Sequence, residues 1–415
     1  MAIAIFEIGS LVCALSPSSI ALIIGRTIQG VGAAGTAGGG FTITAFVVPP
    51  HVQPIVVGLM GCVFTIASIA GPLLGGVFTS EVAWRWCFYI NLPIGGVTII
   101  GMLLFFRTPA HAKSSQKTPI REILASFDPL GSVLMFSGVL CCFLAVQWGG
   151  VSKPWNSANE IGLLSSFLFR LRPNFSFDTQ DNLNAANIAQ QYDLPTYFQA
   201  IQGDTPVESG IKMIPSILPT ALSTMIGSAT IGKLQFFQPF LLVARAICTL
   251  GVGLIYTLDI DTGLGPIIGY QILLGVGTGL AVQTPNLVAT VTSFAEDVSI
   301  AISTVSFFMF LAGSWGVAVS DAILVNLLLE RLPYHVPGID PEAVLVDGAA
   351  GIKNVYEGEV LMGVQLAYLD GLHGGWALAT AAFGVTLLWA LIPRWPGRLS
   401  PPDRTDTRGY EDETR

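Results

Sequence analysis

The sequence predicts an all-α protein, a polytopic membrane helix bundle with about ten transmembrane helices. Hydrophobic residues make up 52% of the chain and charged residues only 11%, whereas soluble domains carry about 25% charged residues. The apolar residues fall into blocks close to the ~20 residues that cross a bilayer as a helix. No cleavable signal peptide precedes the first block, so we interpret that block as a mature helix.

The apolar blocks follow one another along the chain with polar connections between them. The first block is short, and a further apolar run at 161–171 extends only about 16 Å as a helix, too little to span. The blocks expected to span lie at 1–15, 20–44, 56–79, 86–106, 128–148, 213–232, 239–258, 266–290, 300–326 and 372–393.

Glycine-rich helices with charged ends recur in both halves, which suggests two pseudo-repeated bundles. The stretch between the halves is polar, and hydrocarbon excludes it because each buried charge costs at least ~2.5 kcal/mol there. We expect an N-terminal bundle remnant at 1–106, a cytoplasmic loop and linker helix at 107–160, an atypical polar extracellular segment at 161–212, a C-terminal bundle at 213–393 and a disordered cytoplasmic tail at 394–415.

Lysine and arginine mark the loops that we expect to face the cytosol. The loop 107–127 is basic, and counting crossings places Lys233 and the arginines of the tail on the same side. The acidic connections 259–263 and 327–371 fall on the opposite side. Both termini are therefore expected in the cytosol.

The stretch LIIGRTIQGVGAAG places Arg26 deep in an apolar helix, with Gln29 three residues further on the same face. A cation in hydrocarbon is costly and usually faces a cavity or a partner. We favour a buried polar relay on a substrate or proton path over an arginine that snorkels to the interface. The GVGAAG run matches a dinucleotide fingerprint only formally, because no strand precedes it.

The run GPLLGG places Gly71, Pro72, Gly75 and Gly76 in one apolar helix. The proline removes a backbone hydrogen bond, and the glycines allow a neighbouring helix to approach. We expect a kinked, closely packed contact that takes part in function, the alternative being a passive kink.

Aromatic and polar residues lead from this helix into the next one. Such a cluster is typical of the belt at a membrane interface. We favour a structural anchor over direct contact with a ligand. The cluster consists of Trp84, Arg85, Trp86, Asn91 and Pro93.

Polar and aromatic side chains inside the later apolar helices are candidates for a substrate cavity. Hydrogen bonds between helices explain them equally well, so both interpretations stay open. Asp321, late in its apolar block, either pairs with a cation or lies at the outer end of its helix. The cavity candidates are Gln147, Trp148, Gln271, Gln283 and Asn286.

The sequence argues against an enzyme, a metal site and a nucleic-acid partner. Its cysteines lack a C-x-x-C pair and are read as small buried hydrophobes, and its histidines lack metal-ligand spacing. It has no phosphate-binding loop for an ATP-driven pump and no basic footprint for nucleic acid. We therefore expect no catalytic residue, metal or cofactor.

Several motifs together resemble the major facilitator superfamily, and within it the fungal drug:proton antiporters with fourteen spans. They are GRTIQGVGAAG, AGPLLGG and WRWCFYINLPIGG, extended by LPTYFQA, SGIKMIP and GYQILLGVGTGLAVQTP. The resemblance implies two bundles that export drugs, toxins or fungal secondary metabolites at the expense of the proton gradient. It also implies proton coupling through Arg26, with Gln29 beside it, and an antiporter motif at Gly71–Gly76.

Compared with that family, the chain begins at the third helix and lacks about two helices after residue 170, so we expect an N-terminally truncated and internally altered copy. The expected function is a multi-pass efflux transporter, a monomer in the plasma rather than the vacuolar membrane, that exchanges protons for a small amphipathic or hydrophobic substrate. The alternatives are an uptake carrier of the same superfamily and a non-transporting relic. Asn174, in an Asn-Phe-Ser sequence, is a glycosylation candidate if its loop faces outward.

Overall fold

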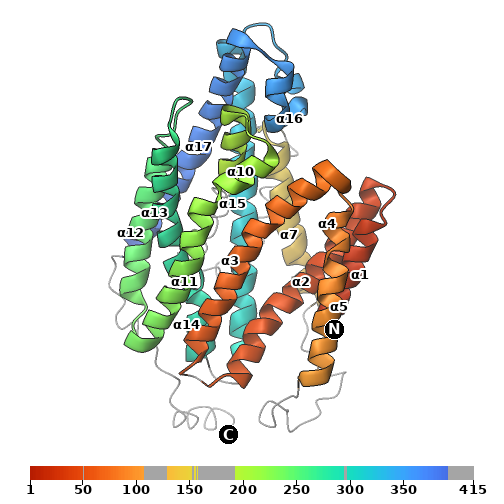
Figure 1. Ribbon diagram of the computed structural model, residues 1–415, viewed down its shortest axis with the longest axis vertical. Coiled ribbons are helices and arrows are strands. Elements are labelled where there is room, and N and C mark those ends of the chain that lie inside the picture. The colour runs from red at the N-terminus through yellow and green to blue at the C-terminus, as the bar shows by residue number, and fades with distance from the viewer. Residues whose placement is uncertain are drawn as a thin grey trace.

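The computed structural model describes residues 1–49, 51–106, 129–151, 154–155, 157, 192–293 and 297–390. Over these residues the chain forms a bundle of long helices (Figure 1). Within them, 8 helices are long and apolar enough to cross a membrane, and two shorter apolar helices lie at Ala2–Ala14 and Gln53–Ser68. The prediction of an all-α polytopic bundle with about ten spans is confirmed.

The first group of helices, which we call the N-terminal group, is built around α1 and α2. α1 packs along α2 and also contacts α4 and α5. The group consists of α1 (Ala2–Ala14), α2 (Ser19–Val47), α4 (Trp86–Tyr89) and α5 (Asn91–Phe105). Leu103, Leu104 and Phe105 on α5 are 80%, 70% and 84% exposed. Apolar surface of this kind fits lipid and not water.

The second group, which we call the C-terminal group, contains the remaining long helices. The helix α3, although early in the sequence, belongs here because it packs along α11, and α7 contacts α15. The group consists of α3 (Gln53–Val77), η1 (Phe78–Val82), α7 (Pro129–Trp148), a helical stretch at 192–197 followed by η3 (Phe198–Gln202), α10 (Pro206–Lys212), α11 (Ile214–Leu234), α12 (Gln238–Ile255), α13 (Leu264–Val282), α14 (Thr284–Thr292), α15 (Val298–His335), α16 (Pro341–Val355) and α17 (Gly358–Ala390).

The main core lies inside the C-terminal group and combines many aliphatic side chains with a few large aromatic ones. Tyr197, Phe198, Trp376 and Phe383 are fully buried in it. Two of these aromatics come from residues 192–202, which directly follow the polar stretch of the sequence. This short helical stretch is therefore part of the core, and Gln365 of α17 holds it by donating hydrogen bonds to the carbonyls of Ala200 and Ile201 at 3.3 and 2.8 Å.

A smaller apolar cluster joins the two groups at the lower end of Figure 1. It combines Phe41 of α2 with Val57 of α3, Ile231 of α11 and Ile302 of α15. The connection between α11 and α12 lies at this end, whereas α16 and the connection between α12 and α13 lie at the upper end (Figure 1). The loop charges predict this alternation, and the assignment of the lower end to the cytosol stays a prediction.

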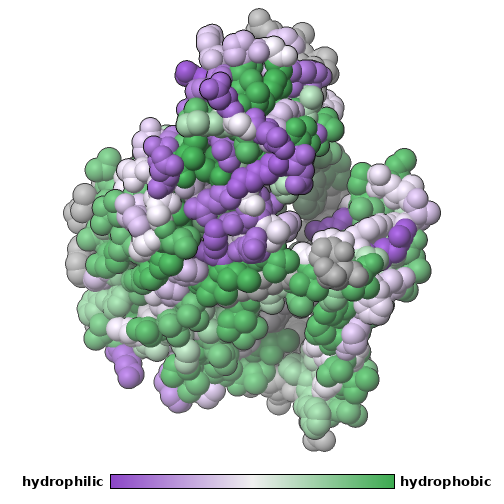
Figure 2. Space-filling model, turned by 45° about the horizontal axis from the view of Figure 1, so that its top comes forward, coloured by the Kyte–Doolittle hydropathy of each residue, from purple (hydrophilic) through white to green (hydrophobic). Residues whose placement is uncertain are grey.

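Hydrophobic and hydrophilic residues separate on the surface. Figure 2 shows apolar residues around the lower part of the visible face and hydrophilic residues gathered over its upper and central parts.

Polar contacts connect the short helices at the upper end. Lys212 contacts Asp204, and Lys353 of α16 donates a hydrogen bond to the carbonyl of Gln202 at 2.6 Å. Glu208 caps α10 together with Thr205, and these hydrogen bonds lower the pKa of the Glu208 carboxyl. The separation of apolar and hydrophilic surface fits a bundle whose apolar sides face lipid.

Candidate functional site

A set of polar side chains connects three helices of the N-terminal group. The Arg26 guanidinium donates to Gln29 Oε1 at 2.9 Å. The Gln29 amide donates to Ser10 Oγ at 2.9 Å, and the Asn91 amide donates to the same hydroxyl oxygen at 3.2 Å. Gln29 and Ser10 are 5% and 0% exposed. We call these four residues the polar network, and it ties α2 to α1 and α5.

Glycine residues allow α1 and α2 to approach closely enough for the polar network to form. A side chain at Gly9, beside Ser10, would collide with the backbone of Gln29, and one at Gly32 would collide with the backbone of Phe6. The helices α1 and α2 therefore touch backbone to backbone, as small residues permit in membranes. This close approach brings the short Ser10 side chain within reach of the Gln29 amide.

The Arg26 side chain is exposed, and its place on a substrate or proton path stays a prediction. Its guanidinium carbon lies 6.0 Å from the centroid of the Phe88 ring, a distance at which a cation is attracted by an aromatic face. A long flexible side chain can leave the apolar helix contact that its shorter neighbour Gln29 occupies. Arg26 is therefore the exposed member of the polar network, while Gln29 is a buried one.

The carboxyl group of Glu7 lies in the same helix contact, and the sequence analysis missed it. Glu7 precedes Ser10 by one turn of α1, and Gly95 follows Asn91 by one turn of α5, so the pairs share helix faces. The Glu7 carboxyl occupies the space in which a side chain at Gly95 would lie. Its Oε2 atom is buried without a hydrogen-bond partner among the described residues.

The aromatic cluster after α3 lies where the chain enters α4. Trp84 and Trp86 are 38% and 50% exposed. The guanidinium of Arg85 lies 4.6 Å from the centroid of the Trp84 ring and donates to the carbonyl of Ser16 at 3.1 Å. These half-exposed rings suit a membrane interface. Asn91 is the exception, because its amide reaches the polar network. Pro93 lies in the first turn of α5.

The glycines of the GPLLGG run have more room than expected. A side chain at Gly71 or Gly75 would meet nothing within 4 Å, and one at Gly76 would lie 3.3 Å from Val207 Cγ2. The tight contact of α3 lies three turns earlier, where a side chain at Gly61 would come within 2.5 Å of Gln283 Cγ. The helix runs through Pro72 without a break in its helical backbone, and functional use of this motif stays a prediction.

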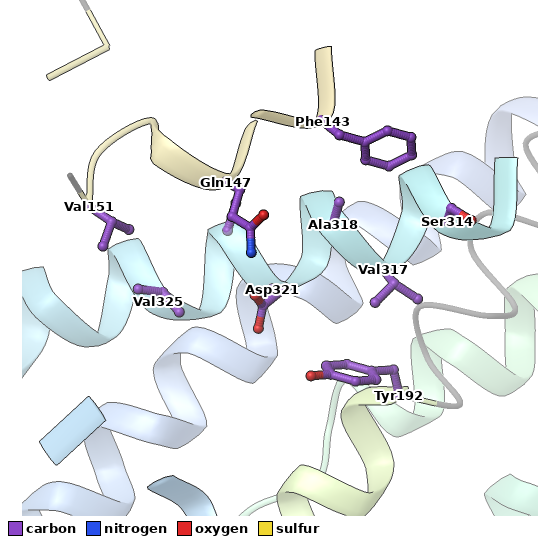
Figure 3. A pocket seen from close by; sticks show the side chains of 10 residues that line it. Phe143, Gln147, Val151, Tyr192, Ser314, Val317, Ala318, Asp321 and Val325 are labelled. Atoms are coloured by element: carbon purple, nitrogen blue, oxygen red, sulfur yellow. The ribbon is translucent and has the colours of Figure 1, made fainter. Parts of the chain in front are cut away.

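A pocket of about 230 Å³ lies between α7, α15 and the start of the 192–202 segment. Asp321 of α15 lies in it, with Gln147 of α7 on one side and Tyr192 on the other (Figure 3). Phe143 of α7 adds an aromatic ring, which contacts Trp315 edge-on at 5.8 Å between centroids. Small apolar side chains of α15, such as Ala318, complete the wall.

A second carboxyl group lies directly behind the pocket. Asp193 is 3% exposed and accepts a hydrogen bond from the Ser320 hydroxyl at 2.6 Å. A side chain at Gly375 of α17 would come within 3.0 Å of the Asp193 carboxyl, so α17 packs tightly against this pair. Asp193 is therefore held in place, whereas the neighbouring Asp321 faces the pocket.

Of the residues predicted to line a cavity, only Gln147 lies in this pocket. Trp148, at the end of α7, is 37% exposed and is not part of the pocket lining. Gln283 and Asn286 are buried at 5% and 0% and hydrogen bond to each other at 3.1 Å, next to α3. Gln271 is fully buried, and both of its amide atoms lack a partner among the described residues. Asn174 lies outside the described residues.

Tyr192 and Asp193 escaped the sequence analysis because they end a long polar run. The only available signal was their position directly before LPTYFQA, a motif already recognised. The partner of Asp193 lies 127 residues further along the chain, and local patterns do not predict a contact at that distance.

An apolar helix bundle with polar side chains at its helix contacts and a pocket between helices is the architecture of a polytopic membrane transporter. The chain belongs to the Major Facilitator Superfamily, whose family model matches residues 1–317. Members of this family are transporters and not enzymes. The resemblance noted in the sequence motifs is thereby confirmed.

Fungal transporters are similar to this chain over most of its length. The MFS-type transporter thnB of Trichoderma harzianum is 36% identical, over 94% of this chain and 71% of that protein. The MFS-type efflux pump MFS1 of Arthroderma benhamiae is 35% identical, over 95% and 78%. The dehydrocurvularin exporter of Aspergillus terreus is 37% identical, over 94% and 73%.

A solved structure supports the fold. The human organic anion transporter MFSD10 (TETRAN) matches with a TM-score of 0.55 and 12% identity, over 94% of this chain and 75% of that chain. At this identity the match shows the shared fold alone. The family match and the similar fungal transporters identify the chain as a multi-pass membrane transporter.

Proposed function

We propose that this chain exports small amphipathic or hydrophobic molecules in exchange for protons, as a monomer of the plasma membrane. Export is supported by similarity to proteins named as an efflux pump and as a dehydrocurvularin exporter. Exchange would occur by alternating access, in which the two helical groups rock against each other around a substrate site. Apolar and aromatic walls would bind most of the substrate, with few polar anchors.

The observation that carries the proton part of the proposal is the Glu7 carboxyl beside the polar network. Ionisable side chains within membrane helices are costly and rare, and they usually mark ion pathways. Glu7 lies at the contact of α1 with α5, one helical turn from Ser10, and one of its oxygens has no partner in the part of the chain that the structure describes. A carboxyl group in this setting is suited to bind and release a proton.

The polar network would respond to the charge of Glu7. A protonated carboxyl is neutral and is compatible with the apolar helix contact. A deprotonated carboxylate would draw donors toward itself, and the amides of Gln29 and Asn91 and the guanidinium of Arg26 are the nearby candidates. Because proton binding would favour one packing of α1, α2 and α5 over another, it would shift the balance between two conformations.

Purified protein in liposomes tests this proposal. Two fluorescent amphipathic dyes serve as substrates, the cationic rhodamine 6G and the neutral Nile red, and a pH-sensitive dye reports proton movement. We expect a proton gradient to drive dye movement at least tenfold above protein-free liposomes. Glu7→Gln should abolish this driven movement but retain exchange of dye for dye, which needs no proton. Arg26→Ala should weaken the driven movement.

The matched control is Glu359→Gln, which removes an exposed carboxylate in the first turn of α17, far along the chain from the polar network. This control should transport as the unmodified protein does. Dye movement without any accompanying proton movement, together with unaltered transport by Glu7→Gln and Arg26→Ala, would show that the coupled mechanism is wrong.

A further inference from the structure

The pocket at Asp321 combines one carboxylate with aromatic rings. Phe143 and Tyr192 contribute aromatic faces, and Gln147 contributes an amide (Figure 3). None of the residues that line the pocket is lysine or arginine. Asp321 has no hydrogen-bond or ion-pair partner among the residues described. The described lining therefore carries one acidic group, and no lysine or arginine of the described residues pairs with it.

Two contacts hold the groups next to the pocket in place. The edge-on contact of Phe143 with Trp315, at 5.8 Å and 66° between rings, holds the Phe143 ring against α15. Behind the wall, the Ser320 hydroxyl donates a hydrogen bond to the buried Asp193 carboxyl, and Gly375 of α17 packs closely against it. The second carboxyl is therefore held behind the wall and is not part of the pocket lining.

The pocket does not suit a metal ion. Calcium takes six to eight oxygen ligands, and magnesium demands near-ideal octahedral coordination. The pocket offers one carboxylate, and the described residues contain no group of three or more histidine, cysteine, aspartate or glutamate side chains that could hold a metal ion. Aromatic faces around a single negative charge instead recognise ammonium groups, through cation–π attraction and ion pairing.

The volume limits the size of the bound group. About 230 Å³ lies below the range of about 300–1,000 Å³ typical of pockets for drug-sized ligands. It accommodates a one-ring aromatic body with an ammonium head. Along α15, Asp321 lies about 35 Å from the first residue of the helix, which places the pocket toward the end opposite the cluster that joins the two groups.

We propose that this pocket binds organic cations, namely protonated or quaternary amines on a compact aromatic or apolar body. The ammonium head pairs with the Asp321 carboxylate, and the body lies against Phe143 and Tyr192. This inference rests on the proposed export function only in treating the bound amine as cargo. The binding itself requires neither a proton gradient nor transport.

Equilibrium binding to the purified protein, followed by isothermal calorimetry, tests the inference with two probes of matched shape. One is 3-(trimethylammonio)phenol, and the other is 3-tert-butylphenol, in which carbon replaces the charged nitrogen. We expect the cation to bind at least tenfold more tightly than its neutral counterpart. Asp321→Asn should remove this preference while leaving the neutral probe unchanged, and Asp321→Glu should retain it.

A second variant keeps the test independent of the charge change. Ala318→Phe should fill the pocket and weaken binding of both probes at least tenfold. Asp261→Asn, which removes an exposed carboxylate in the connection between α12 and α13, should bind both probes as the unmodified protein does. Equal affinity for the two probes, or an undiminished preference for the cation in Asp321→Asn, would overturn the inference.

The outcomes separate this inference from the proposed function. Selective cation binding in a protein that shows no proton-coupled transport would leave the pocket assignment intact and reject the coupling. Proton-driven transport of Nile red with no cation preference in the binding assay would support the coupling and reject the pocket assignment.

Discussion

In the N-terminal group, 17% of the most apolar stretch of α2 and 6% of that of Trp86–Phe105 are buried. In the C-terminal group the buried share is 44% in α11 and in Leu264–Thr292, although α7 and α15 are only 22% and 17% buried. Close glycine contacts occur in both groups, but the first combines them with the polar network and the second with a large buried apolar core. Because few large side chains interlock between α1 and α2, their contact depends on a small number of positions. A substitution of one kind should therefore have unequal effects in the two groups.

The largest expected effect is at Gly32 of α2. A side chain there would collide with the backbone of Phe6, which cannot move without separating α1 from α2. Gly32→Leu should cost about 3 kcal/mol or more and abolish most of the monodisperse protein in fluorescence-detected size-exclusion chromatography. Gly30→Leu lies two residues away in open space and should leave the yield unchanged. Equal yields from the two variants would show that the glycine contact is dispensable.

The fold could largely be predicted from the sequence, because apolar block length and loop charge are local properties. The blocks at 20–44 and 213–232, for example, correspond to α2 and α11. The contacts of single residues could not be predicted in this way. Hydropathy shows that Gln283 lies in an apolar helix, but not that it faces Gly61 of α3 instead of a cavity.

The site was predicted less completely, for two physical reasons. The polar run before residue 192 obscured a helical stretch whose aromatic side chains lie in the core. Glu7 lies in a short apolar helix, and its significance follows only from the space left by Gly95 on α5. The contact of Gln29 with Arg26 could be predicted because their spacing is a property of one helix, which the sequence displays directly.

A moderate effect is expected on α3, which precedes the N-terminal helices α4 and α5 in sequence but packs along α11. Gly61→Ala would bring a methyl group within 2.5 Å of Gln283 Cγ and 2.6 Å of Thr224 Cγ2. These are side-chain atoms that can shift, so we expect a loss of about 1–2 kcal/mol in stability. Gly71→Ala meets no atom within 4 Å and should be neutral, or stabilising by up to about 1 kcal/mol because alanine favours helix.

Transport by the same two variants addresses the GPLLGG motif. If Gly71 is needed for close packing in another conformation, Gly71→Ala should slow transport in liposomes while its melting temperature stays equal or rises. Unimpaired transport and stability together would leave this glycine with no functional role. The Gly61→Ala variant provides the contrast, since its transport and its melting temperature should fall together.

The smallest expected effect concerns two buried amides of the C-terminal group. It tests whether they stabilise the fold or belong to a substrate site. Gln271 and Gln365 are both buried, at 0% and 8% exposure. Gln365 donates to two backbone carbonyls, whereas neither amide atom of Gln271 has a partner among the described residues. An unsatisfied buried polar group costs about 1–3 kcal/mol, and a satisfied hydrogen bond contributes about 1 kcal/mol.

The same substitution should therefore change the melting temperature in opposite directions at the two positions. Gln271→Met should raise the melting temperature by the equivalent of about 1–2 kcal/mol, and Gln365→Met should lower it by a similar amount. Differential scanning fluorimetry in detergent measures both. A Gln271→Met variant that melts no higher and transports more slowly would mean that the amide serves the substrate in another conformation, since a purely structural unsatisfied group gains stability when it is replaced. Equal losses at both positions would mean instead that Gln271 finds a partner, and the contrast between the two glutamines would then disappear.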